Sequence, residues 1–187
     1  MLFRFDNLSL LSPGKKIGKG RDVKYGMLRA QGEVVMFMDA DMATPLRYIE
    51  TFLKAYKRGH EIVVATRNLK RHHPGFLRRA VSNAGNLLYK VLGGVWIEDS
   101  QCGFKLFSSR ANRICFERMT ILGWGFDMEL LAIAHANNIT IKSYRVNDWV
   151  SVPEGTFFEG VVSSSIESLR ELFIIFINRV RGAYKVN

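Results

Sequence analysis

Hydrophobic and polar positions follow two different periods along the chain, and each period predicts one kind of element. The runs 34–38 and 61–66 are almost wholly apolar and rich in β-branched and aromatic residues, which is typical of strands buried on both faces of a parallel sheet. Elsewhere apolar residues recur every three or four positions, as they do on the buried face of a helix. The expected strands are 34–39, 61–66, a short strand ending at Phe107, and 139–146; the expected helices are 21–32, 45–58, 76–92, 109–119, 127–137 and 163–181.

Capping and turn signals fix the joints between these elements. Thr44 is a good N-cap with Pro45 in the first helical position, and Ser109 can cap the helix that follows it. A strand, a helix and a strand with short joints imply a right-handed parallel crossover. The expected architecture is therefore α/β, with a mostly parallel, Rossmann-like sheet flanked by helices in a single domain over residues 1–187. Residues 1–20 show no clear period, and 149–160 is expected to be a loop.

Composition is that of one ordinary domain. The chain has 187 residues, of which 48% are hydrophobic, enough for a sizeable core. No window reaches the roughly 18 apolar residues of a membrane-spanning helix, and the start does not resemble a signal peptide. The two cysteines, Cys102 and Cys115, lack metal-site spacing and do not suggest a disulfide framework, which favours a reducing compartment.

Net charge points to a polyanionic partner. The formal charge is +10, and the basic residues gather at 14–25, 67–79 and 170–185. Nucleic acid, an anionic membrane and phosphorylated substrates all fit such a charge. Aromatic residues are not interleaved with basic ones as in RNA-binding modules. In the absence of a metal, phosphates would be crowded by the acidic groups Asp39, Asp41, Glu98 and Asp99. Nucleic acid is therefore ranked last.

Two carboxylates, Asp39 and Asp41, end the apolar run 34–38. They fall at the carboxyl end of the predicted strand, where open α/β sheets bind ligands. Hard cations such as Mg²⁺ or Mn²⁺ take carboxylate oxygens and share themselves with substrate phosphates. The alternative is an ordinary strand end with one capping and one solvated aspartate.

The last predicted helix contains an apolar run at 172–177, followed by Arg179, Arg181 and Lys185. Six residues cannot span a bilayer, but they can lie in its interface with the cations near anionic head groups. Packing against the domain or another subunit explains the run equally well.

Four motifs follow one another over roughly 15–185: Lys19-Gly20 before a helix, Asp39-Ala40-Asp41, the block 99–107 (DSQCGFKLF) and the block 124–131 (WGFDMELL). In this order they resemble the family 2 glycosyltransferases, most closely the dolichyl-phosphate glucosyltransferase and mannosyltransferase branch. The resemblance implies a GT-A fold and inverting, metal-assisted transfer of a hexose. The donor would be a nucleotide sugar, with UDP-glucose favoured, and the acceptor a polyprenyl or dolichyl phosphate. It also implies work at the cytosolic face of a membrane, which would be the endoplasmic reticulum in a eukaryote or the plasma membrane in a prokaryote.

The same resemblance assigns roles to residues. Asp39 and Asp41 match the family's metal-binding pair, with Lys19 and Gln101 as weaker donor-site candidates. Arg67, Arg78 and Ser82 match positions that engage the acceptor phosphate; without that context they look like a solvated basic loop and helix face.

Asp99 matches an acidic position that serves as general base in relatives with sugar acceptors. A phosphate acceptor is already ionised, so Asp99 would here position other groups. Trp124 and Phe126 suit a place near the sugar or lipid, or in the core.

Residues 1–20 do not match the family's first strand-helix-strand portion, which holds the nucleotide's base and ribose. This departure predicts a member without that portion. It also keeps two other hypotheses open: a non-catalytic remnant that binds a membrane or a partner chain, and a transferase acting on a sugar hydroxyl.

Overall fold

A four-stranded mixed sheet forms the centre of the computed structural model, which describes residues 8–67, 87–149 and 158–186. Its strands are β1 (Val34–Met38), β2 (Ile62–Arg67), β3 (Phe104–Ser108) and β4 (Ile141–Val146). The order is β1-β3-β2-β4. β3 runs antiparallel to β1 and β2, whereas β2 and β4 are parallel. Three strands therefore point the same way, and β3 points against them.

The expected α/β architecture is confirmed, but the neighbour of β1 differs from the prediction. β1 and β2 run in the same direction as predicted, yet β3 lies between them. β1 is at one end of the described sheet, and only Val35 and Phe37 are fully buried, while the alternate residues are half-buried. An unbroken apolar run therefore overstated the burial of this strand, because such a run does not reveal how many neighbours the strand has.

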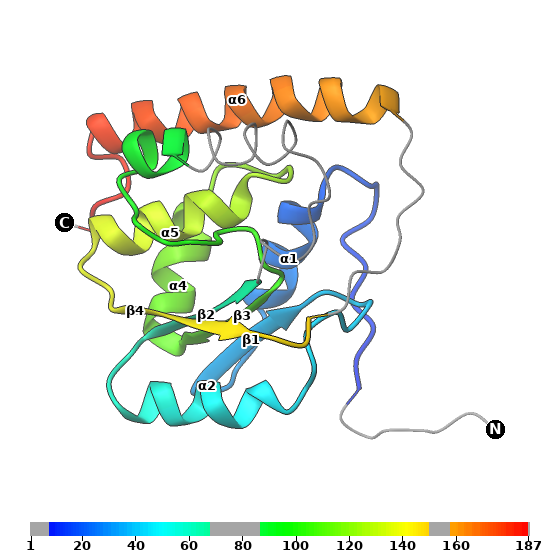
Figure 1. Cartoon of the computed structure of the whole chain (residues 1–187), viewed down its shortest axis with the longest axis vertical. Coiled ribbons are helices and arrows are strands. Elements are labelled where there is room, and N and C mark those ends of the chain that lie inside the picture. Colours follow the sequence, from blue (N-terminus) through cyan, green and yellow to red (C-terminus); the bar gives the residue numbers. More distant parts are fainter. Residues whose placement is uncertain (1–7, 68–86, 150–157, 187) are drawn as a thin grey trace.

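Helices cover both faces of the sheet (Figure 1). α2 (Tyr48–Lys57) lies on one face. The other face carries α1 (Lys19–Met27), α4 (Ser109–Arg118) and α5 (Phe126–Ala136), and α6 (Phe158–Val180) lies outside α5. The sheet is thus the boundary between a small apolar cluster around Phe52 and a large one that reaches α6.

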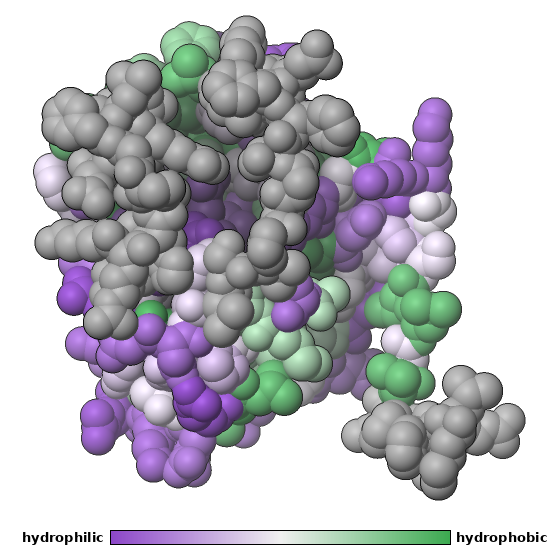
Figure 2. Space-filling model, turned by 45° about the vertical axis from the view of Figure 1, so that its right-hand side comes forward, coloured by the Kyte–Doolittle hydropathy of each residue, from purple (hydrophilic) through white to green (hydrophobic). Residues whose placement is uncertain are grey.

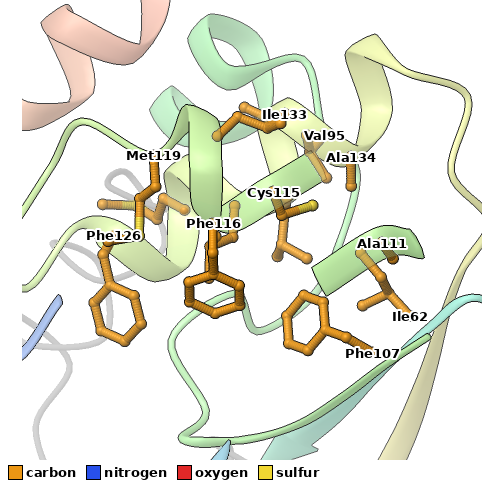
Figure 3. Packing of buried hydrophobic residues seen from close by; sticks show 14 of the residues in the cluster. Ile62, Val95, Phe107, Ala111, Cys115, Phe116, Met119, Phe126, Ile133 and Ala134 are labelled. Atoms are coloured by element: carbon orange, nitrogen blue, oxygen red, sulfur yellow. The ribbon is translucent and has the colours of Figure 1, made fainter. Parts of the chain in front are cut away.

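The larger cluster contains several aromatic rings. Figure 3 shows the rings of Phe126, Phe116 and Phe107 in one row. The ring centroids of Phe107 and Phe116 are 5.5 Å apart in an edge-to-face arrangement. The ring centroid of Phe37, in β1, lies 5.8 Å from that of Phe126. Edge-to-face pairs add to the stabilisation that burial of the rings provides. This core holds the helices that carry the candidate site.

The starts of α2, α4 and α6 differ from the predicted positions. α2 begins at Tyr48, because a turn closed by Tyr48 N–H on the Pro45 carbonyl (3.2 Å) precedes it and Thr44 is buried rather than capping. α4 is capped by Ser108, whose hydroxyl accepts from Ala111 N at 3.0 Å, one residue before the predicted cap. α6 begins at Phe158, inside the predicted loop 149–160.

The remaining boundaries differ by a few residues. α1 starts at Lys19 and ends at Met27 instead of running from 21 to 32, and β4 starts at Ile141 instead of 139. Of the predicted helix 76–92, residues 87–93 are helical and 76–86 lie outside the described residues. Within the described ranges, no helix has both the length and the apolar character needed to cross a bilayer.

The segment before α1 has no regular secondary structure, and its first residues are mostly apolar. Residues 8–18 form neither helix nor strand, and Leu10 is 97% exposed. Figure 2 shows green, apolar side chains along this segment at the right of the molecule. The lack of a clear period over residues 1–20 thus agrees with the structure as far as Gly18, after which α1 begins.

Candidate active site

The site residues meet at one edge of the sheet. Because β1 and β2 run in the same direction, Asp39, which follows β1, and Arg67, which ends β2, lie at the same edge. β3 begins at this edge, so the segment 99–103 that leads into it brings Asp99 and Gln101 there as well. From the sequence, the carboxyl ends of the strands placed Asp39, Asp41 and Arg67 at one edge, whereas Asp99 and Gln101 were candidates only through the family resemblance. The topology brings both sets to the same edge of the sheet.

Asp39 is held between α1 and the start of β3. Its carboxylate Oδ1 lies 2.5 Å from Lys19 Nζ, and its backbone N–H donates to the Gly103 carbonyl at 2.8 Å. A Cβ atom added at Gly103 would lie 2.0 Å from Asp39 Oδ2. The position of the Asp39 carboxylate therefore requires glycine at 103. Lys19 places a cation in direct contact with that carboxylate.

Asp41 lies in a tight turn and is exposed. Its Oδ1 accepts from Ala43 N at 3.0 Å, and Met42 between them has a positive φ of 52°. Met42 N–H also donates to the Asp39 carbonyl at 3.1 Å. Non-glycine residues with positive φ are uncommon and concentrate at functional turns. The turn holds the second carboxylate in solvent, next to the first in sequence.

These two carboxylates fit a shared metal ion and not an all-protein cage. Among the residues that the structure describes, no group of three or more His, Cys, Asp or Glu side chains is arranged to hold a metal. Mg²⁺ is typically held through one or two carboxylates together with substrate phosphates. Asp41 uses Oδ1 for its bond to Ala43, and Asp39 uses Oδ1 for its contact with Lys19. The Oδ2 atom of each aspartate takes no part in these two interactions. The donor set is therefore suited to a cation that arrives with a diphosphate.

Arg67 and Asp99 form a buried bidentate pair. Arg67 Nε donates to Asp99 Oδ2 at 2.7 Å and Arg67 Nη2 to Oδ1 at 2.9 Å. Two backbone N–H groups, of Arg67 and Gln101, donate to the same carboxylate at 3.0 and 3.2 Å. The sequence predicted both residues for the site but not their contact. Bidentate guanidinium–carboxylate geometry is among the strongest hydrogen-bonded arrangements in proteins.

This pairing sets the ionisation of Asp99. Burial alone would raise the pKa of this carboxyl, but the hydrogen bonds and charge of Arg67 outweigh it, so the pKa lies below its usual value. For Arg67 the desolvation that lowers its pKa is likewise outweighed by Asp99, so its pKa is raised. Asp99 is therefore ionised at neutral pH, and its carboxylate orients the Arg67 fork.

A second buried pair was missed by the sequence reasoning. Lys105 Nζ contacts Asp127 Oδ1 and also donates to the Cys102 carbonyl at 2.7 Å. Both side chains are almost completely buried, and burial raises the pKa of Asp127 despite the nearby charge of Lys105. The signal was a lysine inside the apolar run Phe104–Phe107 and an aspartate opening a helix. Neither residue alone shows that they are partners.

The remaining predicted site residues divide into three groups. Gln101 is exposed at the same edge, and Arg78 and Ser82 lie outside the described residues. Phe126 is fully buried in the core (Figure 3), whereas Trp124 is 63% exposed. The aromatic pair that looked alike in sequence is thus divided into one core residue and one surface residue.

α6 reaches the site through Glu171. Glu171 Oε2 accepts from Gly125 N at 2.8 Å, and a Cβ atom at Gly123 or Gly125 would lie 2.3 or 2.6 Å from the Glu171 carboxylate. Burial raises the pKa of Glu171. No motif pointed to this residue; its only signal was an acidic position before the apolar run 172–177.

The apolar run itself has two sides. Leu172 and Ile175 are buried against the domain, as the packing hypothesis predicts. Phe173 is 61% exposed, and Leu169 and Val180 are exposed as well. The run therefore packs on the protein through one side and presents an apolar side to solvent.

Comparison with known proteins gives a family and a fold. A family model described as "Glycosyl transferase family 2" matches residues 5–116. A dolichyl-phosphate beta-glucosyltransferase of Trichomonas vaginalis is 32% identical over 178 residues, which cover 89% of this chain and 54% of the relative. The enzyme of that name from Dictyostelium discoideum is 31% identical, with 96% and 57% covered. The chain thus spans about half the length of the curated relatives that it matches.

A solved structure shares the fold. Glucosyl-3-phosphoglycerate synthase from Mycobacterium tuberculosis, in complex with Mn²⁺, UDP-glucose and glycerol 3-phosphate, superposes with a TM-score of 0.63 at 15% identity. The superposition covers 86% of this chain and 55% of that one. The expected GT-A-like architecture is thereby confirmed, since the match extends over most of the chain.

Proposed function

The chain belongs to glycosyl transferase family 2, and we propose that it transfers a hexose from a nucleotide sugar, UDP-glucose being favoured, to a polyprenyl or dolichyl phosphate. The observation that carries the proposal is the carboxylate pair at the end of β1, with Lys19 beside Asp39 and Asp41 exposed in its turn. The names of the relatives support the lipid acceptor, and the solved neighbour, which is a complex with Mn²⁺ and UDP-glucose, supports the donor.

On the donor side, Asp39 and Asp41 would hold Mg²⁺ or Mn²⁺ together with the diphosphate. The bound cation would offset negative charge on the departing nucleotide. Lys19 adds a positive charge at the same place, and Gln101 supplies an exposed amide at the sheet edge. UDP-glucose carries an α-linked glucose, so formation of a β product, as the relatives' names state, corresponds to inversion at the anomeric carbon.

On the acceptor side, Arg67, Arg78 and Ser82 would bind the lipid phosphate. Arg67 donates to Asp99 through Nε and Nη2. Its third nitrogen, Nη1, takes no part in these two bonds. Asp99 would thus act as a positioning residue that fixes the direction of the guanidinium. This role agrees with its lowered pKa, because an ionised phosphate needs no base to become a nucleophile.

The proposal includes a membrane surface, where a polyprenyl phosphate would reside. The exposed side chains of Leu169, Phe173 and Val180 on α6 would enter the bilayer interface, near the exposed cation Arg181. Arg179 instead donates to the carbonyls of Val91 and Leu92, at 3.3 and 3.1 Å. Co-sedimentation with phosphatidylserine vesicles should decrease for Phe173→Ser and at high salt. Equal sedimentation of the variant and the wild type would remove the membrane from the proposal.

Calorimetric titration tests the donor site directly. UDP should bind in the presence of Mn²⁺, and binding should be lost with a chelator or in Asp41→Asn. Glu33→Gln is the control, because it removes an exposed negative charge just before β1, at the end of that strand opposite to Asp39. Equal heats with and without Mn²⁺ and in all variants would overturn the metal-diphosphate site. The transfer step is measured as glucose that moves from UDP-glucose into a solvent-extractable polyprenyl phosphate. Donor binding without such a product would overturn the acceptor assignment.

A further inference from the structure

Trp124 is an exposed aromatic ring at the candidate active site. It follows Gly123 in the turn before α5, and 63% of its surface is exposed although its near neighbour Phe126 is completely buried. Tryptophan is large and highly buried on average, and an exposed indole offers a ligand a wide apolar face. The question is which part of a substrate would cover it.

The turn that carries Trp124 is held from two sides. From α1, the N–H groups of Gly20 and Arg21 donate to the carbonyls of Gly123 and Leu122, each at 3.2 Å. From α6, Glu171 accepts from Gly125 N at 2.8 Å. These bonds fix the backbone on each side of Trp124. An exposed ring on a fixed backbone is pre-organised for a ligand, because little ordering is needed on binding.

The ring lies one side chain away from the metal-diphosphate carboxylates. Lys19 Nζ is 5.3 Å from the centroid of the Trp124 ring and 2.5 Å from Asp39 Oδ1. Lys19 therefore bridges the indole and the first carboxylate of the pair. A ligand whose diphosphate meets Asp39 and Lys19 would bring the group attached to that diphosphate near the indole.

We propose that Trp124 is the platform on which the hexose of the nucleotide-sugar donor stacks. This inference rests on the proposed function, in which Asp39 and Asp41 bind the diphosphate. The hexose is bonded directly to that diphosphate, and the C–H groups on one face of a pyranose form an apolar surface that matches an indole face. Hydroxyl groups at the rim of the sugar remain free for the polar residues of the sheet edge.

The α6 side of the turn is acidic, which disfavours an anionic bilayer as the occupant. A Cβ atom at Gly123 would lie 2.3 Å from Glu171 Oε1 and 3.6 Å from Glu167 Oε1. Two carboxylates of α6 therefore border the turn. They would repel anionic head groups, whereas a neutral sugar carries no charge to be repelled.

Comparing UDP with UDP-glucose in calorimetry tests the platform. Trp124→Ala should bind UDP with Mn²⁺ as the wild type does, but UDP-glucose roughly threefold to tenfold more weakly, as expected for the loss of one aromatic contact. Trp124→Phe, which keeps a flat ring, should recover most of that affinity. Trp96→Ala is the matched control, because Trp96 is also exposed, whereas Lys19 lies over the ring of Trp124.

Each result has a distinct meaning. Unchanged binding of both ligands in Trp124→Ala would overturn the platform and leave the donor site intact. Equal weakening of UDP and UDP-glucose would place the indole against the nucleotide and overturn the sugar assignment. Loss of phosphatidylserine vesicle binding in Trp124→Ala, with UDP-glucose affinity unchanged, would assign the ring to the bilayer instead. Absence of UDP binding by the wild type would overturn the proposed donor site, and this inference with it.

Discussion

Two buried carboxylate–cation pairs lie at the same edge of the sheet, and they differ in the ionisation of their acids. Asp99 receives four hydrogen bonds from Arg67 and the backbone, and its pKa is lowered. Asp127 is bonded by Lys105 through a single Nζ, and its pKa is raised by burial. Burial disfavours the charged form in both cases. In this protein the carboxylate with four donors has the lowered pKa, and the one bonded by a single lysine has the raised pKa.

The two pairs also differ in what they face. The Arg67 side chain is 23% exposed, so the Asp99–Arg67 pair reaches the surface where a substrate phosphate would arrive. Lys105 is completely buried and contacts the ring of Phe37, whose centroid is 5.4 Å from its Nζ. The first pair is therefore placed for binding, whereas the second connects β3 to α5 beneath the site.

Removing Lys105 should have the largest effect on stability. Lys105→Met leaves Asp127 buried without its cation, and breaking a buried ion pair in this way costs about 3–5 kcal/mol. Replacing both partners, in Lys105→Met/Asp127→Leu, should recover much of the loss because no buried charge remains. Urea unfolding of the wild type and the two variants measures both effects. A single variant as stable as the wild type would show that Asp127 does not depend on Lys105.

The contributions of Asp99 and Asp127 to stability should change in opposite directions as the pH is varied. The folded pKa of Asp99 is below its unfolded value of about 4, so its stabilising contribution is present at neutral pH and is lost as the pH falls through that range. The folded pKa of Asp127 is above its unfolded value, so its contribution is present at low pH and is lost as the pH rises toward the folded pKa.

Thermal unfolding between about pH 3 and pH 8 measures this difference. Relative to the wild type, Asp99→Asn should remove part of the acid destabilisation, and Asp127→Asn should remove part of the loss that occurs on raising the pH. Parallel pH profiles for the two variants would contradict the assignment of opposite shifts.

Part of this site could be read from the sequence, because its signals are local. The apolar run 34–38 placed Asp39 and Asp41 at a strand end, and the motif at 99–107 placed Asp99 at the same site. The strand directions then placed Arg67 near Asp39 and Asp41, since residues that follow parallel strands share an edge of the sheet. For the same reason the helix ends were predicted within a few residues: each depends on neighbours in the chain.

Pairings between distant segments could not be read in this way. Nothing local indicated that β3 would insert antiparallel between β1 and β2, because hydrophobic alternation carries no direction. The partner choices Arg67–Asp99 and Lys105–Asp127 join residues 32 and 22 positions apart and exist only once that insertion has occurred. The link from α6 to the Trp124 turn through Glu171 is likewise a product of packing.

The smallest expected effect on stability concerns a third pair, Lys19–Asp39, whose side chains are 27% and 37% exposed. Solvent screens such a pair, so Lys19→Met should change the free energy of unfolding by about 1 kcal/mol or less. This is well below the loss expected for Lys105→Met, although both substitutions remove a lysine from an aspartate. The contrast would separate burial from charge as the origin of the stability difference.

The same variant should nevertheless weaken UDP binding in the presence of Mn²⁺, because it removes the cation that lies beside the proposed diphosphate site. Lys16→Met is the control: Lys16 is exposed three residues earlier, and its loss changes the net charge equally. Calorimetry and urea unfolding on the two variants give the comparison. If Lys19→Met bound UDP like Lys16→Met, Lys19 would only hold Asp39 in place. If it proved as destabilising as Lys105→Met, the distinction between exposed and buried pairs would not apply at this edge.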